Sequence, residues 1–292
     1  MKEITSYNIS VLVTCYNRKK KTLSFLESLF SQANYKSLNV DVYLLDDGST
    51  DGTSDAVKSN FPDVNVVTGN GNLFWAGGMR AVWKYALEQK NYDLFFLFND
   101  DVILLENAFE NLVKQYSRLD TEGVILVGST LSRISEKLTY GGNLFKNLKH
   151  CDYYRIEPDT EKCIPCHMGN ANVLVIDRFT VDKIGIFPEI YTHCLADYDY
   201  TLTACKSGIG VWLAPGYYGY CENDHGLNWM PGSVPLKKRI EYLYSPKGLA
   251  YKEYLYYIKK HFPSDYIISF TKLWLKTLLP VIWDKFKNRE TL

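Results

Sequence analysis

The stretch NVDVYLLDDGSTDGTSDAV, residues 39–57, combines three kinds of local sequence in a fixed order. It begins with the β-branched and apolar residues that are typical of a buried strand, and a loop of Gly, Ser, Thr and Asp follows. Residues that can start a helix close the stretch. Asp46 and Asp47 stand where the strand gives way to the loop. The stretch therefore predicts a strand–loop–helix unit with two carboxylates at the carboxyl end of the strand.

The same order recurs on both sides of this unit. Strands alternating with helices predict an α/β protein with a mostly parallel sheet and helices on both of its faces. The strands that we expect lie over residues 8–17, 64–69 and 92–101, and later over 123–132, 171–178 and 210–215. Helical or turn segments are predicted over 20–32 and 76–89, and later over 179–189 and 196–208.

The composition gives no reason to expect a nucleic-acid partner, because the 292 residues carry no net formal charge. The N-terminal residues contain no apolar run long enough for a signal peptide, and no stretch reaches the about 18 uncharged apolar residues of a spanning helix. Seven cysteines without an export signal are usual for a reduced compartment. We therefore expect a cytoplasmic protein.

The residues from 236 to 292 differ in composition from the rest, being rich in Tyr, Trp, Leu and Lys. They predict a C-terminal helical segment whose second helix ends or kinks at Pro280. Within it, residues 265–289 interleave aromatic side chains with lysines. Such a segment can lie on an anionic membrane surface, as a peripheral contact at the inner face of the cell membrane. It can equally pack its apolar stripe on the preceding domain or on a second copy.

The predicted strand over 92–101 ends in Asn99, Asp100 and Asp101. One carboxylate there would serve a turn or the start of the next helix. Two adjacent carboxylates repel each other unless a cation lies nearby, and Mg²⁺ or Mn²⁺ is often held by one or two carboxylates together with phosphates. The residues alone leave both explanations open.

Other polar groups accompany the remaining strand ends, and the carboxyl ends of parallel strands meet at one edge of a sheet. Tyr16 could stack on a base, and glycines at 77 and 78 allow a ligand to approach the backbone closely. Arg80 could meet a phosphate or form a surface ion pair. We expect these groups to converge with the aspartates on one site.

The ordered set VLVTCYNR, VYLLDDGSTDGT, NLFWAGGMR, FLFNDDV, GNANVLVIDR and ADYDYTL resembles the family-2 nucleotide-sugar glycosyltransferases of GT-A fold, over roughly residues 8–230. LFWAGGMR is most similar to the branch with bacterial rhamnosyltransferases and galactofuranosyltransferases. The resemblance implies a Rossmann-like catalytic domain over 1–235. Its nucleotide-binding half would be 1–101 and its acceptor half 102–235, with 236–292 as a helical appendage.

The resemblance also implies roles for individual residues. Asp47 would bind the ring N–H of uracil or thymine, and Asp101 would be the main protein ligand of a divalent ion, Mn²⁺ or Mg²⁺, with Asp100 shared between metal and ribose. His225 would be a further metal ligand, although a lone His is more often structural. The implied donor-binding set is Thr14, Tyr16, Asn17, Asp46, Asp47, Gly77, Gly78, Arg80, Asn99 and Asp100.

Two acids in ADYDYTL correspond to the family's general-base region. The resemblance implies that Asp197 is the base, with Asp199 as its neighbour in the catalytic set. Ala196 stands where family members typically have Glu, which leaves the acidic triplet incomplete. Without the resemblance, these acids would be read as the solvated N-terminus of a helix.

The function that the resemblance implies is an inverting, metal-dependent transfer of a sugar from a UDP- or dTDP-sugar. The sugar would be rhamnose, galactofuranose or another hexose, and the acceptor a hydroxyl of a surface polysaccharide or a lipid-linked glycan. The Ala196 substitution leaves a catalytically inactive nucleotide-sugar-binding or scaffold protein as an alternative. A sugar nucleotidyltransferase is less favoured, because VTCYNRKKK lacks the glycines of its first loop.

One cysteine motif has no place in this scheme. Cys163, Cys166 and His167 match the C-x-x-C-H string of haem attachment, and with His150 and Cys151 they could form a zinc site. Covalent haem attachment normally requires export, and we favour a chance match over either cofactor.

Overall fold

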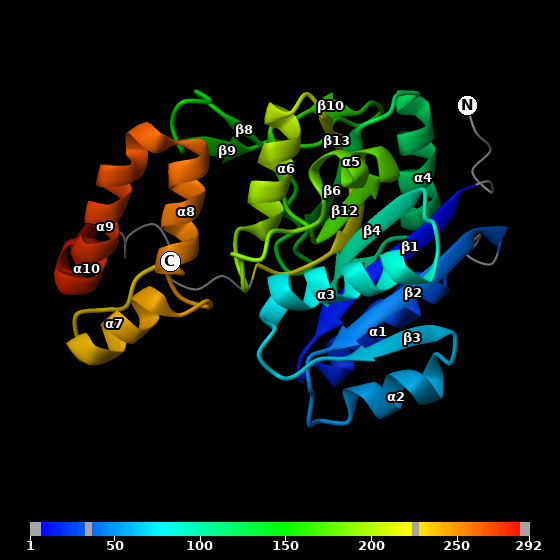
Figure 1. The fold of residues 1–292 in the computed structure, drawn as a ribbon, viewed down its shortest axis with the longest axis horizontal. Coiled ribbons are helices and arrows are strands. Elements are labelled where there is room, and N and C mark those ends of the chain that lie inside the picture. Colours follow the sequence, from blue (N-terminus) through cyan, green and yellow to red (C-terminus); the bar gives the residue numbers. More distant parts are fainter. Residues whose placement is uncertain (1–6, 33–36, 224–227, 287–292) are drawn as a thin grey trace.

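The computed structural model describes residues 7–32, 37–223 and 228–286, and its centre is a ten-stranded sheet (Figure 1). The main path of the sheet runs in the order β10-β13-β6-β12-β4-β1-β2-β3. These strands are β1 (Asn8–Cys15), β2 (Asn39–Asp46), β3 (Val64–Thr68), β4 (Leu94–Asn99), β6 (Val124–Leu131), β10 (Ile164–Pro165), β12 (Val173–Asp177) and β13 (Gly210–Tyr220). Two short strands, β5 (Ile103–Leu104) and β7 (Leu138–Tyr140), pair with β13 and β6.

The direction of the strands confirms the predicted mostly parallel α/β sheet. β3, β2, β1 and β4 pair in parallel, and β13 is parallel to β6. Among the long strands of the described residues, β12 alone runs the other way: it is antiparallel to both β4 and β6. A separate three-stranded sheet in the second half has the order β11-β8-β9, formed by β8 (Gly142–Phe145), β9 (Tyr153–Arg155) and β11 (Met168–Gly169).

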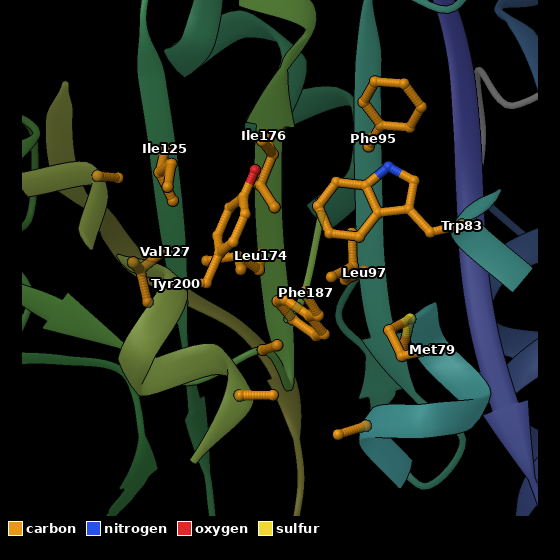
Figure 2. Close-up of a cluster of buried hydrophobic side chains, with 14 of the residues drawn as sticks. Met79, Trp83, Phe95, Leu97, Ile125, Val127, Leu174, Ile176, Phe187 and Tyr200 are labelled. Carbon is orange, nitrogen blue, oxygen red and sulfur yellow. The ribbon is translucent and has the colours of Figure 1, made fainter. Parts of the chain in front are cut away.

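Helices cover both faces of the central sheet, which explains the uninterrupted apolar runs of its strands. Along β4, Phe95 and Leu97 belong to the buried cluster on one face, and Leu94, Phe96 and Phe98 to the cluster on the other. The first cluster packs α3 (Phe74–Gln89), α5 (Arg178–Ile184) and α6 (Ala196–Lys206) on the sheet, as Figure 2 shows for its central side chains. The second packs α1 (Lys19–Phe30), α2 (Thr53–Asn60) and α4 (Ala108–Leu119).

The C-terminal segment is helical and lies beside α6, on the left of Figure 1. One of its helices shares the main core, because Tyr257, Ile258 and Phe262 belong to the same buried cluster as α3 and α6. Pro280 lies between the last two helices, at the break predicted for it. The segment consists of α7 (Leu236–Tyr244), α8 (Tyr251–His261), a 3₁₀ turn (Pro263–Asp265), α9 (Tyr266–Leu278) and α10 (Val281–Phe286). None of the helices in the described part of the chain combines the length and apolarity that a membrane crossing requires.

Candidate functional site

Hydrogen bonds join the loops that follow β1 and β2. The backbone N–H of Asn17 donates to Ser49 Oγ over 2.8 Å, and Asn17 Oδ1 accepts from the backbone N–H of Thr50 over 2.7 Å. Asn17 has a φ of 51°, in the left-handed region that Asn tolerates better than most residues. The neighbouring Tyr16 is 46% exposed at the end of β1 and is accessible for stacking. The first two strand ends therefore form one connected surface.

Asp46 and Asp47 are both buried, and their oxygens hold loop backbone and a neighbouring hydroxyl. Asp46 accepts from the Ser49 N–H at 2.8 Å and from the Ser54 hydroxyl at 2.5 Å. Asp47 accepts from the backbone N–H groups of residues 71, 73 and 74 over 2.8–3.0 Å. Asp47 thus fixes the loop that leads into α3, and its contact with a base remains a prediction.

Of the two glycines at the start of α3, Gly78 is tightly packed and Gly77 has only ordinary contacts. A Cβ on Gly78 would come within 2.3 Å of Thr14 Oγ1, so only glycine lets α3 approach β1 this closely. The backbone N–H groups of Ala76 and Gly77 both donate to the Thr192 carbonyl, at 3.1 and 3.2 Å. These contacts bring the start of α3 against the loop that precedes α6.

Arg80 is directed toward that same loop. Its guanidinium donates to the carbonyls of Pro188 and Tyr191 over 2.9 and 3.1 Å. Burial lowers the pKa of Arg80, and the charges of Glu189 and Glu253 oppose this effect. The structure therefore shows Arg80 holding the loop before α6, while its contact with a diphosphate remains a prediction.

The aspartate pair at the end of β4 has cations from the chain itself. Arg18 bridges both carboxylates, and Lys21 Nζ lies 3.4 Å from Asp101 Oδ2. Asp100 is buried and also accepts from the Thr22 hydroxyl over 3.1 Å. Burial raises the pKa of Asp100 to about 6, against the opposing charge of Arg18. The repulsion between the two acids is therefore relieved by the loop after β1 and the first turn of α1.

The oxygens of this pair are suitable in kind for Mg²⁺ or Mn²⁺, because both metals prefer carboxylate ligands. Asp101 Oδ1 also lies 3.5 Å from the thiol of Cys221, at the end of β13. Within the described residues, no three His, Cys, Asp or Glu side chains gather closely enough to hold a metal ion by themselves. His225, the further predicted ligand, lies outside the described residues.

A short bridge connects the end of β4 with the start of α6. Asn99 Oδ1 accepts from the indole N–H of Trp75 over 2.8 Å, and the Asn99 N–H donates to the Asn172 carbonyl over 3.3 Å. The preceding Ala171 donates its backbone N–H to Asp197 Oδ2 over 3.1 Å. Residues 171 and 172 therefore place Asp197 at the same sheet edge as the aspartates of β4.

Asp197 lies in the first turn of α6, where backbone N–H groups donate to both of its oxygens. Burial raises its pKa to about 6, although hydrogen bonds from the backbone N–H groups of Ala171 and Tyr198 act against the shift. The hydrogen bonds of its side chain come from these backbone groups, whereas Asp100 is paired with the Arg18 guanidinium. A carboxylate with a pKa near the working pH can accept a proton and later release it.

Asp199 faces the other way, away from Asp197. Its carboxylate is 1% exposed and accepts from His261 Nε2 at 2.7 Å and from Lys260 Nζ at 2.8 Å, both in α8. Burial raises its pKa, but hydrogen bonds and charges of His261 and Lys260 outweigh burial and leave the pKa lowered. Asp199, placed in the catalytic set from sequence, therefore links α6 to the C-terminal segment through both of its oxygens, and its part in catalysis remains a prediction.

The cysteine motif has ordinary structural contacts. His167 Nδ1 accepts the Phe145 backbone N–H over 3.0 Å, and Cys166 is buried, which raises the pKa of its thiol. His150 Nδ1 lies 2.7 Å from Asp265 Oδ1, in the turn before α9. These contacts engage one ring nitrogen of each histidine.

Several residues at this edge were not predicted from sequence. Arg18 and Lys21 of CYNRKKK have no predicted role, yet both pair with Asp101. Their pairing with the acids could be inferred from sequence if β1 and β4 are taken as neighbouring strands, because the basic residues after β1 then lie near the acids after β4. Trp75, in contrast, forms its bond to Asn99 through an indole that no sequence pattern singles out.

Comparisons with known proteins agree with this architecture. The family model described as glycosyl transferase family 2 matches residues 10–170, more than half of the chain. The 4,4'-diaponeurosporenoate glycosyltransferase of Staphylococcus aureus (strain bovine RF122 / ET3-1) is 25% identical over 120 residues. These residues are 41% of this chain and 31% of that protein, so the match spans about a third of the relative's length.

Two solved structures are similar in fold. The mannosyltransferase PcManGT from Pyrobaculum calidifontis, in complex with GDP-Man and Mn²⁺, has a TM-score of 0.53 and 16% identity, over 92% of this chain and 70% of that one. Residues 1–349 of S. aureus TarS, in complex with UDP, have a TM-score of 0.55 and 15% identity, over 73% of this chain and 60% of that one. The family match and these folds together establish that the chain belongs to glycosyl transferase family 2 and has the mixed α/β GT-A fold of such glycosyltransferases.

Proposed function

We propose that this chain is an inverting glycosyltransferase that moves a hexose, such as rhamnose or galactofuranose, from a UDP- or dTDP-sugar to a hydroxyl of a surface glycan or lipid-linked glycan. The observation that carries the proposal is the convergence at one sheet edge. The loops after β1, β2 and β4 are joined there to Asp197 through residues 171–172. A donor bound on the loops would present its sugar toward Asp197, a carboxylate of raised pKa that is not paired with Arg18 as Asp100 is.

The donor half of the proposal rests on the first three strand ends. Tyr16 offers an exposed ring for stacking on the base, and Asp46 and Asp47 hold the loops beside it. Arg18 and Lys21 bring positive charge to the place where a diphosphate would lie. Relatives with similar folds were solved with GDP-Man or with UDP, which supports a nucleotide-linked donor here.

The transfer step is assigned to Asp197. The acceptor oxygen attacks the anomeric carbon, the bond from that carbon to the diphosphate breaks, and the bonding electrons leave with the nucleoside diphosphate. Asp197 takes the proton from the attacking hydroxyl. Attack from the side opposite the leaving group inverts the anomeric centre, and one base is sufficient for this reaction.

Asp101 and Asp100 would hold a divalent ion, Mn²⁺ or Mg²⁺, whose chemistry is to stabilise the charge on the departing diphosphate. Their oxygens are the kind of ligand that such ions select, and a complex of a relative with Mn²⁺ supports the assignment. Arg18 and Lys21 now engage these oxygens, so both cations would have to turn toward the diphosphate when the donor binds.

Replacing Asp101 by Ala should remove metal-dependent donor binding. Ligands that bind the folded state raise its unfolding temperature, and at about 100 times Kd the gain is about 2.7 kcal/mol. A thermal-shift panel of UDP-, dTDP- and GDP-sugars with and without Mn²⁺ should show stabilisation of the wild type by one donor class, and much less in Asp101→Ala.

The matched control for this panel is Asp182→Ala, which removes an exposed ion pair with Arg178 in α5, beside the opposite end of β4. It should behave as the wild type does. If no nucleotide sugar stabilises the wild type, the transferase proposal is wrong. If Asp101→Ala responds as strongly as the wild type, the metal assignment alone is wrong.

We also propose that α9 and α10 meet the inner membrane surface. Ile267, Ile268 and Phe270 of α9 are 76%, 56% and 41% exposed, and lysines at 272 and 276 lie on the same helix. Apolar side chains beside basic ones favour an anionic lipid surface. The last part of the predicted contact segment, residues 287–289, lies outside the described residues.

The membrane proposal predicts that Ile267→Asp with Ile268→Asp abolishes sedimentation with phosphatidylglycerol vesicles. Ile134→Asp is the matched control, because Ile134 is 87% exposed but lies in the turn between β6 and β7. Vesicle binding that survives the double substitution would show that α9 is not the contact.

A further inference from the structure

Phe74 connects the loop that Asp47 holds with the loop that runs into α6. Its backbone N–H donates to Asp47 Oδ2 over 3.0 Å, and its ring lies 6.1 Å from the ring of His193, centroid to centroid. The next residue, Trp75, donates its backbone N–H to His193 Nδ1 over 3.4 Å and its indole N–H to Asn99 over 2.8 Å. Phe74 therefore stands between the proposed base-binding acid and the proposed general base, which lies in the first turn of α6.

The backbone of Phe74 is strained. Its φ is 54°, in the left-handed region that bulky side chains rarely adopt, although α3 begins at this residue. A residue stays in such a conformation only when the contacts around it determine its position, and residues of this kind are found most often at ligand sites. The ring of Phe74 is only partly buried, so a molecule at the sheet edge can reach it. The strain is thus a first indication that a ligand lies along this ring.

The C-terminal segment places a positive charge over the same ring. Lys247 lies in the turn between α7 and α8, and its Nζ is 5.7 Å from the centroid of the Phe74 ring. The same turn contacts the loop before α6, because the Cys194 thiol donates to the Pro246 carbonyl over 3.5 Å. The Lys247 ammonium is therefore held beside the strained residue and beside the loop that leads to the general base.

The position of Lys247 is not explained by a partner within the protein. The residue is exposed, and no Asp or Glu of the described residues lies within ion-pair distance of its ammonium group. An exposed contact between a lysine and the face of a phenylalanine contributes little to stability. An ammonium group is, however, a common ligand of phosphate. In a nucleotide sugar the negative charge is on the diphosphate, which lies between the base and the sugar, and Lys247 stands at the matching place between Asp47 and Asp197.

We propose that Lys247 is a donor-binding residue, supplied by the C-terminal segment, whose ammonium group binds the diphosphate of the nucleotide sugar. The inference rests on the proposed transferase function and adds to it that the turn between α7 and α8 completes the donor site. The diphosphate is then bound from two sides, by Lys247 over Phe74 and by the basic residues after β1. When the bond from the anomeric carbon to the diphosphate breaks, the electrons leave with the nucleoside diphosphate, and the ammonium offsets the charge that develops there.

Two substitutions of Lys247 test this contact by titration calorimetry of the full chain with UDP, dTDP and GDP in the presence of Mn²⁺. Lys247→Met keeps an unbranched side chain over Phe74 and removes the charge. It should weaken binding of the nucleotide that binds the wild type by about tenfold or more. Lys247→Arg keeps a charge that can bind phosphate, and its affinity should stay within about threefold of the wild type.

The matched control is Lys259→Met, which removes a lysine from the exposed surface at the other end of α8 and should bind nucleotide as the wild type does. The unfolding temperature without nucleotide should be the same in all three variants, because both lysines are exposed. Equal affinity of Lys247→Met and the wild type, a similar loss in Lys259→Met, or an equal loss in Lys247→Arg would each overturn the proposal. A lowered unfolding temperature in Lys247→Met would show that this lysine serves the packing of the segment, and would overturn it as well.

The result is separable from that of the proposed function. If a nucleotide binds the wild type and Lys247→Met equally well, Lys247 is not a donor ligand and the transferase function stands. If no nucleotide binds the wild type and no nucleotide sugar stabilises it, the transferase function is wrong, and this inference is wrong with it.

Discussion

Asp197→Asn should lower the rate of sugar transfer by about 10²–10⁴-fold, the usual contribution of a positioned general base. Asparagine keeps the size of the side chain and the oxygen that accepts from the Ala171 N–H, but it cannot accept the proton of the attacking hydroxyl. Donor affinity should remain within a few-fold of the wild type, because the donor contacts come from the strand ends. Transfer is measured as product formed at saturating donor.

The pH dependence of the transfer rate of the wild type is a second test of the role of Asp197. Because burial raises the pKa of Asp197 to about 6, the base is ionised above that pH and protonated below it. Transfer should therefore be constant at higher pH and fall as the pH drops through about 6. The residual activity of Asp197→Asn should lose the part of this acid limb that belongs to Asp197 and keep the part that Asp100, whose pKa is also raised to about 6, contributes. Full turnover in the variant, or an unchanged acid limb, would assign the proton to another group.

Asp199→Ala should destabilise the protein by about 3–5 kcal/mol, the usual cost of breaking a buried ion pair by removing one partner. The change leaves His261, which is 5% exposed, and Lys260 without their common acceptor. It also removes the hydrogen-bonded link between α6 and α8. The free energy of unfolding is measured by urea denaturation, with the slope compared between variants to confirm that the same surface is exposed.

Asp182→Ala is the control for this loss. Asp182 pairs with Arg178 within α5, but both side chains are well exposed, so the loss should be about 0–1 kcal/mol. Similar losses in the two variants would show that the Asp199 cluster is no more than a surface contact. Asp199→Ala should still bind donor at low temperature, because its carboxylate does not face the sheet edge.

Acidification should weaken the contact between Asp199 and His261 and so lower the free energy of unfolding. Burial lowers the pKa of His261, and Asp199 only partly restores it. The folded state therefore favours neutral His261, and the unfolded state gains a proton as the pH falls below the ordinary histidine value. The pKa of Asp199 is also lowered, so its contribution is present above the ordinary aspartate value and is lost as the pH falls through its folded pKa. Both effects make the protein less stable in acid.

The elements of the sheet could be predicted from sequence because their signals are local. β1, β2 and β4 are continuous apolar runs, each followed by polar residues, and the parallel arrangement follows from the helices between them. The short strands from β7 to β11 could not be predicted, since two to four residues show no periodicity. They form through pairing with distant parts of the chain.

The roles of polar residues were harder to predict than their positions. Asp197 and Asp199 lie two positions apart and look alike in sequence. Only the fold shows that Asp197 faces the sheet edge and Asp199 faces α8. Arg80 was expected to meet a ligand, and its partners are carbonyls more than a hundred positions away. Composition at a strand end predicts that a site exists there, whereas the partner of each side chain depends on contacts far apart in sequence.

The most direct measurement of the central claim is release of nucleoside diphosphate from a panel of UDP-, dTDP- and GDP-sugars with Mn²⁺. Glycosyltransferases with a bound donor and no acceptor should hydrolyse it slowly, so one donor class should yield free nucleoside diphosphate with the wild type. Asp197→Asn and Asp101→Ala should each lower this release, and Asp182→Ala should leave it unchanged. No release from any donor, or equal release by all of these variants, would contradict a sugar-transfer site at the carboxyl edge of this sheet.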